Sequence, residues 1–331
     1  MSTIVAVTSL EQLEALCGGG DVAPLGEREF SLHAPDAHLA ALGSDGTLAG
    51  RCSLWWHAVP PCPGERVGLI GHYEAADGET AALLLARALG ELVRHGCTLA
   101  VGPMDGNTWR RYRFVTRRGT EPPFFLEPDN PDDYPGHFLS AWFVPLARYY
   151  SNLDPDLGWS LAGAAELEER LQSEGVTFRP LGLDAFGTEL ERIYELSVAG
   201  FRNNFLYTPI DRSEFLEMYA GVRAVVVPEL VWFAEQGDRP LGFIFAVPDV
   251  LRATTGEPSD TVIFKSMAVL PAWEGKGIGS LFLSIITEQA RRKGFRRGIH
   301  ALMHEANRSR MLSGHHGVEM REYTLFSRRL P

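Results

Sequence analysis

Glycines alternate with other small or charged residues in one short run, Glu274-Gly275-Lys276-Gly277-Ile278-Gly279-Ser280. The run lies between a predicted strand and a predicted helix. Glycines allow backbone N–H groups to converge on an anion, and the N-terminus of the following helix adds partial positive charge. The run therefore indicates a phosphate or pyrophosphate site, to which Lys276 adds a full charge. The alternative is a tight turn that needs glycine only for a positive φ.

Two common nucleotide-binding motifs do not fit this run. Its spacing is G-x-G-x-G and not the G-x-G-x-x-G of dinucleotide-binding folds, and it contains no G-x-x-x-x-G-K-[ST]. The predicted anion site is therefore neither a Rossmann fingerprint nor a P-loop.

Cysteines and a basic run are the other groups with possible chemistry. The cysteines form no C-x-x-C pair and have no histidine at zinc-ligand spacing, so we expect reduced thiols and no metal. The four are Cys17, Cys52, Cys62 and Cys97. The basic residues between positions 291 and 297 fall at a predicted helix end. Cations are favoured there, so we interpret them as a solvated surface and not as a ligand site.

The elements around the glycine run predict a mixed domain with one parallel crossover. A strand over residues 261–270, a helix over 280–293 and a strand over 298–303 form a strand–helix–strand unit. Helices are also predicted over residues 188–201 and 211–219. Residues 66–102 predict a second such unit in the first half. The two units fit an internal duplication and unrelated units equally well, because any two units of this type look alike.

The first half also contains a proline-rich stretch over residues 121–135, which predicts a long ordered loop or lid. The aromatic residues 138–150 that follow predict a strand. The total length of 331 residues suits two domains, and 45% hydrophobic residues suffice for ordinary cores. We find no apolar run of membrane-spanning length and no signal-like N-terminus, so we expect a cytoplasmic protein. The net charge of −11 argues against nucleic-acid and membrane partners.

The segment Met267-Ala268-Val269-Leu270-Pro271, the glycine run, Asn307 and Gly317-Val318 occur in an order that closely resembles the GCN5-related N-acetyltransferase (GNAT) superfamily. The resemblance covers residues 176–331 and is weaker in the first half. It implies an α+β fold of tandem GNAT-like acyl-CoA N-acyltransferase domains, each a mixed, mostly antiparallel sheet with one parallel crossover. We expect a degenerate domain over residues 1–155, a linker and helix over 156–175, and a coenzyme-binding GNAT domain over 176–331.

The resemblance also implies how acetyl-CoA is held. The loop would cradle the pyrophosphate, and backbone groups of Met267 and Val269 would pair with the pantetheine arm as with an added strand. The thioester would lie where the two parallel strands separate, near a backbone N–H close to Val269, and an amine would attack it directly. The coenzyme-binding candidates are Met267, Ala268, Val269, Glu274, Gly275, Lys276, Gly277, Ile278, Gly279, Ser280 and Asn307.

Several residues depart from the family pattern. Glu274 stands where the family usually has Arg or Gln. The corresponding run in the first half, residues 74–79, carries three carboxylates and one glycine, so it would repel a pyrophosphate. The family's frequent tyrosine acid falls near Ser313. Water or one of three nearby residues could replace it, namely His315, His316 or Tyr323.

A proton acceptor for the attacking amine is also needed. His304 and Glu305 follow the strand after the crossover helix and could act through water, or they could only cap a helix that starts at Asn307. Tyr207 lies where the family lines its acceptor site.

The resulting prediction is an N-acetyltransferase that moves an acetyl group from acetyl-CoA to an amine of a small molecule or peptide. We expect a monomer or homodimer without a metal. The competing hypothesis is a non-catalytic acyl-CoA binding or sensing protein, favoured by Glu274 and by the missing tyrosine. A purely structural module is the third.

Overall fold

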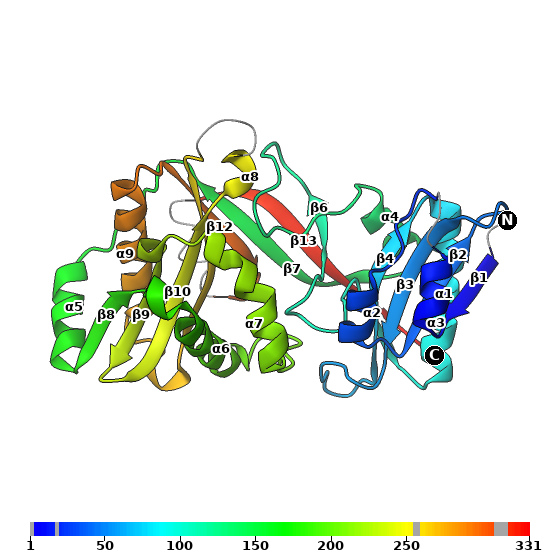
Figure 1. Cartoon of the computed structure of the whole chain (residues 1–331), viewed down its shortest axis with the longest axis horizontal. Helices are drawn as coiled ribbons and strands as arrows, with labels where there is room; N and C mark the ends of the chain where they lie inside the picture. Colours follow the sequence, from blue (N-terminus) through cyan, green and yellow to red (C-terminus); the bar gives the residue numbers. More distant parts are fainter. Residues whose placement is uncertain (1–2, 17–19, 254–258, 308–316) are drawn as a thin grey trace.

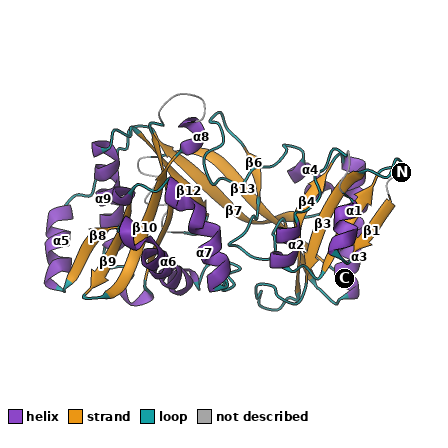
Figure 2. Ribbon diagram, viewed as in Figure 1, coloured by secondary structure: helices purple, strands orange, loops and turns teal. Residues whose placement is uncertain are grey.

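The computed structural model describes residues 3–16, 20–253, 259–307 and 317–331. Its strands form one long sheet in the order β1-β2-β3-β4-β5-β13-β7-β12-β11-β10-β9-β8, and β6 pairs with β13 outside this path. Figure 1 shows two lobes joined by the long strands β7 and β13, and Figure 2 shows helices flanking the strands of each lobe. The mixed α and β architecture expected from the sequence is present.

The first half of the chain supplies most of the lobe in which both termini lie (Figure 1). Its strands are β1 (Thr3–Val7), β2 (Ala37–Leu42), β3 (Leu48–Trp55), β4 (Val67–Ala75), β5 (Leu99–Gly102), β6 (Phe114–Arg117) and β7 (Val144–Asp154). Its helices are α1 (Leu10–Ala15), α2 (Glu27–His33), α3 (Gly78–Arg94) and α4 (Tyr134–Ser140).

The second half supplies most of the other lobe. Its strands are β8 (Val176–Pro180), β9 (Val231–Gln236), β10 (Arg239–Pro248), β11 (Thr261–Val269), β12 (Arg297–His304) and β13 (Val318–Arg329). Its helices are α5 (Ala164–Ser173), α6 (Phe186–Phe201), α7 (Arg212–Ala220), α8 (Val250–Ala253) and α9 (Ile278–Arg292).

Each half contains one parallel strand pair connected through a helix. β4 pairs with β5 over residues 67–69, and α3 connects them; β11 pairs with β12 over residues 261–264, and α9 connects them. Both strand–helix–strand units predicted from the sequence are therefore present. The other strand pairings that the structure describes are antiparallel.

The sheet of the second lobe is covered on both faces because side chains alternate along its strands. On β10, Phe243 and Phe245 belong to the core that packs under α6, whereas Ile244 and Ala246 belong to the core under α9. Helix α9 buries residues at positions 278, 281, 282 and 286, which is the spacing of one helix face. The face under α6 is the one that carries the cavity described below.

The last strand of each half is exchanged between the lobes. β7 lies between β12 and β13, and β13 lies between β5 and β7. The first half therefore supplies the strand that borders β12, and the end of the chain supplies the strand that borders β5. Figure 1 shows β7 in green and β13 in red running side by side between the lobes.

The prediction of one strand over residues 138–150 is wrong in its first part. Helix α4 contains Phe138, which is fully buried against the first core, and Pro135 stands in the first turn, where the missing N–H of proline is tolerated. β7 starts only at Val144 and runs on to Asp154. The proline-rich stretch predicted as a loop over residues 121–135 forms no helix or strand over 121–133, but its last two residues, Tyr134 and Pro135, begin α4. Cys52, Cys62 and Cys97 are free thiols, and Cys17 lies outside the described residues.

Candidate active site

β11 and β12 separate after their last parallel pair, Phe264 with His300. Beyond that point β11 stays paired with β10 as far as Val269, while β12 pairs with β7 as far as His304. The edge of residues 265–269 that faces β12 therefore has no ladder partner among the described strands. Such an edge can hydrogen-bond an extended ligand. It includes Met267, Ala268 and Val269, which the sequence predicts to bind the coenzyme arm.

The glycine run adopts the backbone that an anion site needs. Gly275 has φ +76° and Gly277 has φ +96°, and both angles favour glycine. Gly277 is the N-cap of α9 and no side chain caps the helix there, so the first-turn N–H groups remain available. Ile278 is buried, whereas Gly279 and Ser280 are partly exposed. The predicted pyrophosphate residues therefore lie at a free helix N-terminus.

Helix α5 holds this loop from the outside. Arg170 donates a hydrogen bond of 2.7 Å to the carbonyl of Lys276, and Glu174 lies 3.4 Å from the Lys276 ammonium. The ammonium also lies 4.0 Å from the centre of the Trp273 ring. Glu274, the residue that departs from the family pattern, is exposed. The lysine charge at the loop is thus fixed in place and partly offset by Glu174.

A cavity of about 1060 Å³ lies on the α6 face of the sheet, next to the gap between β11 and β12. The first half contributes residues 108–113, 126–129 and 149 to its wall, and the second half contributes α6, the following loop, α7, β10, β11 and β12. Residues 274–280 do not line it. The gap therefore lies between the glycine run on one side and the cavity on the other.

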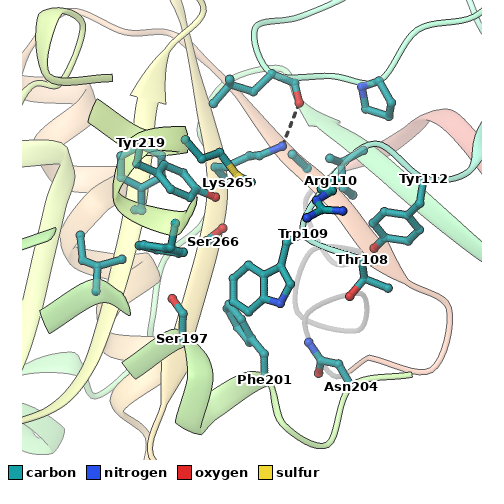
Figure 3. Close-up of a pocket in the computed structure, with 18 of the residues that line it drawn as sticks. Thr108, Trp109, Arg110, Tyr112, Ser197, Phe201, Asn204, Tyr219, Lys265 and Ser266 are labelled. Atoms are coloured by element: carbon teal, nitrogen blue, oxygen red, sulfur yellow. Dashed lines mark hydrogen bonds between the residues drawn. The ribbon is translucent and has the colours of Figure 1, made fainter. Parts of the chain in front are cut away.

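Trp109 and Arg110 anchor the first half to this cavity (Figure 3). The indole N–H of Trp109 donates to the carbonyl of Thr208 at 2.8 Å, and its ring packs 5.8 Å from that of Phe215. Arg110 forms two hydrogen bonds with Glu214, of 2.6 and 3.0 Å, and both side chains are nearly buried. The cavity is thus complete only with both halves present.

Lys265 extends from β11 into the cavity, one residue beyond the last parallel pair. Its ammonium donates a hydrogen bond of 2.9 Å to the carbonyl of Leu126, the dashed line in Figure 3. Burial, assisted by the positive charge of Arg113 and opposed by Glu127, lowers the pKa of Lys265 to about 7. An amine with this pKa is neutral in a large fraction of molecules at pH 7. The sequence gives no sign of this group, because no motif surrounds it.

His304, one of the two candidate proton acceptors, lines the cavity, but its hydrogen bonding favours a donor role. Its Nδ1 accepts the N–H of Ala306 at 3.1 Å, and burial lowers the pKa of the ring. A neutral imidazole with Nδ1 as acceptor carries its proton on Nε2. The ring packs edge-on against Tyr149 at 5.0 Å. His304 can therefore donate a hydrogen bond into the cavity but is poorly suited to accept a proton.

The other predicted catalytic residues lie in different places. Tyr207 lines the cavity, where its hydroxyl donates to the carbonyl of Val198 at 3.2 Å. Glu305 is exposed and does not line the cavity; its carboxylate accepts the N–H of Arg148 at 3.0 Å. Its position does not suit the predicted water relay. Asn307 lines the cavity and is the last residue described before position 317, so Ser313, His315 and His316 lie outside the described residues.

A buried polar network fastens the proline-rich loop beside Lys265. Glu127 forms an ion pair with Arg321 at 2.9 Å and accepts a hydrogen bond from the hydroxyl of Tyr323. That hydroxyl also lies 3.0 Å from Ser151, whose Oγ accepts the N–H of Leu302 at 3.1 Å. Tyr323, one of the residues considered as an acid, is fully buried in this network and belongs to the support of the cavity.

The corresponding helix start in the first half differs in charge and length. α3 begins at Gly78, directly after β4 ends at Ala75, with no glycine loop between them. The carboxylate of Asp77 accepts the N–H of Thr80 at 2.7 Å and so occupies the helix N-terminus. Glu74 pairs with Arg51 at 2.6 Å. An anion at this helix start would meet a carboxylate that already fills the site.

A model of a known protein family matches part of the sequence. Residues 190–311 match the model of the acetyltransferase (GNAT) family. This part of the chain, most of its second half, belongs to the GNAT family. Within the described residues we find no cluster of three or more side chains arranged to bind a metal, and none of their helices has the length and apolarity of a membrane span.

Two curated relatives match parts of the sequence at low identity. It is 22% identical to "Protein YghO" of Escherichia coli over 197 residues, which is 57% of this chain and 49% of that protein. It is 22% identical to a "bacterial ceramide synthase" of Caulobacter vibrioides over 238 residues, which is 71% of this chain and 62% of that protein. The matches thus span about half to three-fifths of the length of these relatives.

The structural likenesses extend over the whole chain. A tandem GNAT protein from the clavulanic acid biosynthesis pathway matches with a TM-score of 0.51 and 11% identity, over 99% of this chain and 98% of that one. A GCN5-related N-acetyltransferase from Anabaena variabilis matches with a TM-score of 0.51 and 12% identity, over 99% of this chain and 73% of that one. At these identities the likeness shows the fold alone.

Proposed function

We propose that this GNAT protein transfers an acyl group from an acyl-coenzyme A, with acetyl-CoA as the donor, to the nitrogen of an amine. The observation that carries the proposal is the gap between β11 and β12, with a free helix N-terminus on one side and the cavity on the other. A thioester held along the open edge of β11 would meet an amine held in the cavity. Membership of an acetyltransferase family supports the same reaction.

In the proposed reaction the amine attacks the thioester carbonyl, so that a C–N bond forms and the C–S bond breaks. The proton of the ammonium passes to Lys265, whose amine stands in the cavity beside the gap. The sulfur leaves as a thiolate and takes a proton from Lys265 or from water. His304 donates a hydrogen bond from Nε2 toward the reacting groups, the role its hydrogen bonding leaves open.

The name of one relative agrees with transfer to nitrogen. A ceramide is an amide, and the Caulobacter vibrioides relative is named a ceramide synthase. For the present chain we propose a small-molecule or peptide amine as the acceptor. The first half, in which Asp77 fills the corresponding helix start, is proposed to have no coenzyme site and to complete the acceptor cavity.

Coenzyme binding and turnover test the proposal together. We expect calorimetry to show one acetyl-CoA site per chain, and thiol release to depend on an added amine. Gly277→Ala should raise the Kd for acetyl-CoA about tenfold or more, because φ is +96° and the new Cβ would lie 2.9 Å from Leu167. Gly294→Ala is the matched control: φ is +91° but the surroundings are open, so only stability should fall.

The competing hypothesis, a non-catalytic acyl-CoA binding protein, gives a different result in the same experiment. It predicts one site lost in Gly277→Ala but no thiol release with any amine. Two sites per chain would contradict the proposal for the first half. Unchanged acetyl-CoA affinity in Gly277→Ala would contradict the assignment of the loop.

A further inference from the structure

The wall of the cavity under α6 and α7 is formed mainly by apolar side chains. α6 contributes Phe186, Leu190 and Ile193, and α7 with the turn after it contributes Phe215 and Val222; Ser197 of α6 and Tyr219 of α7 are the polar side chains among them. The floor comes from Phe243 and Phe245 of β10. Protein interiors seldom leave voids larger than a water molecule, and an apolar cavity binds apolar ligands in preference to water. A volume of about 1060 Å³ lies at the upper end of the range for ligand pockets.

Polar groups lie at the gap and at the wall supplied by the first half. Lys265 and His304 stand at the gap, Thr108 and Arg110 belong to the wall from the first half, and Asn204 belongs to the loop after α6. Figure 3 shows this arrangement: Tyr219 and the side chains around it lie on the α7 side, and Thr108, Arg110 and Tyr112 lie opposite, with Trp109 between them. The cavity therefore has an apolar part and a polar part.

We propose that the acceptor amine carries a long unbranched apolar chain, which lies between α6, α7 and β10 while its nitrogen lies at Lys265. This inference rests on the proposed function and specifies its acceptor. The chain is assigned to the acceptor and not to the acyl group because the coenzyme loop, residues 274–280, takes no part in the lining. An acyl-CoA that enters from the loop reaches the gap, whereas the apolar part lies beyond it.

Straight-chain amines from butylamine to dodecylamine, below their micelle concentrations, provide the test. We expect calorimetric Kd values for the full chain with bound coenzyme A to fall by up to about fourfold for each added methylene, until the cavity is filled. Thiol release from acetyl-CoA should show the same trend in kcat/KM. A parallel series from acetyl-CoA to dodecanoyl-CoA with butylamine should show no such gain.

A cavity-filling variant ties the trend to this site. Ile193→Trp places a larger ring in the apolar part and should remove most of the gain in affinity from butylamine to dodecylamine. Glu195→Trp adds the same ring at an exposed position of α6 that does not line the cavity, and it should keep the full trend. Circular dichroism and coenzyme A affinity show whether Ile193→Trp is folded. If it is not, Leu190→Phe repeats the test with a smaller addition.

Each outcome bears on one proposal. Chain-length-dependent amine binding without thiol release would support the apolar site and overturn the proposed acyl transfer. Thiol release that is equal for butylamine and dodecylamine would support acyl transfer and overturn the apolar acceptor. A gain that appears only in the acyl-CoA series would overturn the assignment of the chain to the acceptor.

Discussion

Lys265 is the residue on which the proposed chemistry depends most. Its hydrogen bond to the carbonyl of Leu126 connects β11, at the gap, to the proline-rich loop that lines the cavity. Its carbon stem and ammonium stand in a wall of mostly apolar side chains, which explains why burial lowers its pKa to about 7. A base with this pKa balances proton affinity against the fraction that is free to accept a proton.

The pH dependence of turnover follows from this pKa. Above about pH 7 Lys265 is neutral and can accept a proton, so kcat/KM should rise with pH and level off once the pH exceeds about 7. Lys265→Met should lower kcat/KM by about 10²- to 10⁴-fold and remove this rise. Lys265→Arg should do the same, because a guanidinium stays protonated. Steady-state thiol release between pH 5.5 and 9 measures both effects.

Lys293→Met is the control for this prediction. Lys293 follows the last turn of α9 at the surface, paired with Glu229, and does not line the cavity. Its variant should keep the wild-type profile. If Lys265→Met also keeps that profile, the proton acceptor is another group, and a water molecule held at the gap becomes the alternative.

At the scale of elements, a row of hydrogen-bonded histidines connects three strands and a helix of the first half. His38 on β2 and His72 on β4 each lie 2.8 Å from the hydroxyl of Ser53 on β3, and His33 of α2 lies 2.7 Å from His72. Burial lowers the pKa of His38 to about 3 and that of His72 to about 2. His38 and His72 are therefore neutral in the folded protein near neutral pH and well below it.

The buried histidines make the free energy of unfolding depend on pH, and the sign of the dependence follows from their lowered pKa values. Below about pH 6.5 the unfolded histidines bind protons and the folded ones do not, so the free energy of unfolding falls as the pH falls. Each buried ring should lower the free energy of unfolding at pH 4.5 by about 2–3 kcal/mol relative to its value at neutral pH. Asp105 acts in the opposite direction, because burial raises its pKa to about 6, but one carboxyl offsets only part of the effect of several histidines.

His38→Asn isolates one member of this row. The amide can keep the hydrogen bond to Ser53 that Nδ1 of His38 makes, and it does not titrate. Urea unfolding at pH 7.5 and pH 5 should show a smaller loss of stability for the variant than for the wild type. An identical loss in both proteins would mean that His38 does not contribute to the pH dependence.

The parts that the sequence predicts well are those that depend on neighbouring residues. The positive-φ glycine loop, α9 and the two crossover units follow from glycine spacing and from periodicity over a few turns. Residues 138–150 show the limit, because their aromatic side chains fit a buried helix as well as a strand, and the core of the first lobe decides between the two. The cavity could not be predicted, since Trp109 meets Phe215 across more than a hundred residues of chain.

At the scale of the whole molecule, the exchange of β7 and β13 makes the two lobes depend on each other. β7 comes from the first half but fills the position between β12 and β13, next to the gap in which the reaction is proposed. The predicted boundary near residue 155 separates β7 from the strands that it pairs with. The sequence could not show this, because strand pairing between distant segments leaves no local pattern.

Cutting the chain after residue 155 therefore tests the architecture. Residues 156–331 alone lack β7, so the facing edges of β12 and β13 have no ladder partner from within the fragment, and such edges favour aggregation. We expect this fragment to be insoluble by itself but soluble when residues 1–155 are produced in the same cells, with both copurifying through size-exclusion chromatography. The pair should bind acetyl-CoA like the intact chain. A monomeric 156–331 fragment with the affinity of the intact chain would show that β7 is dispensable for the coenzyme site.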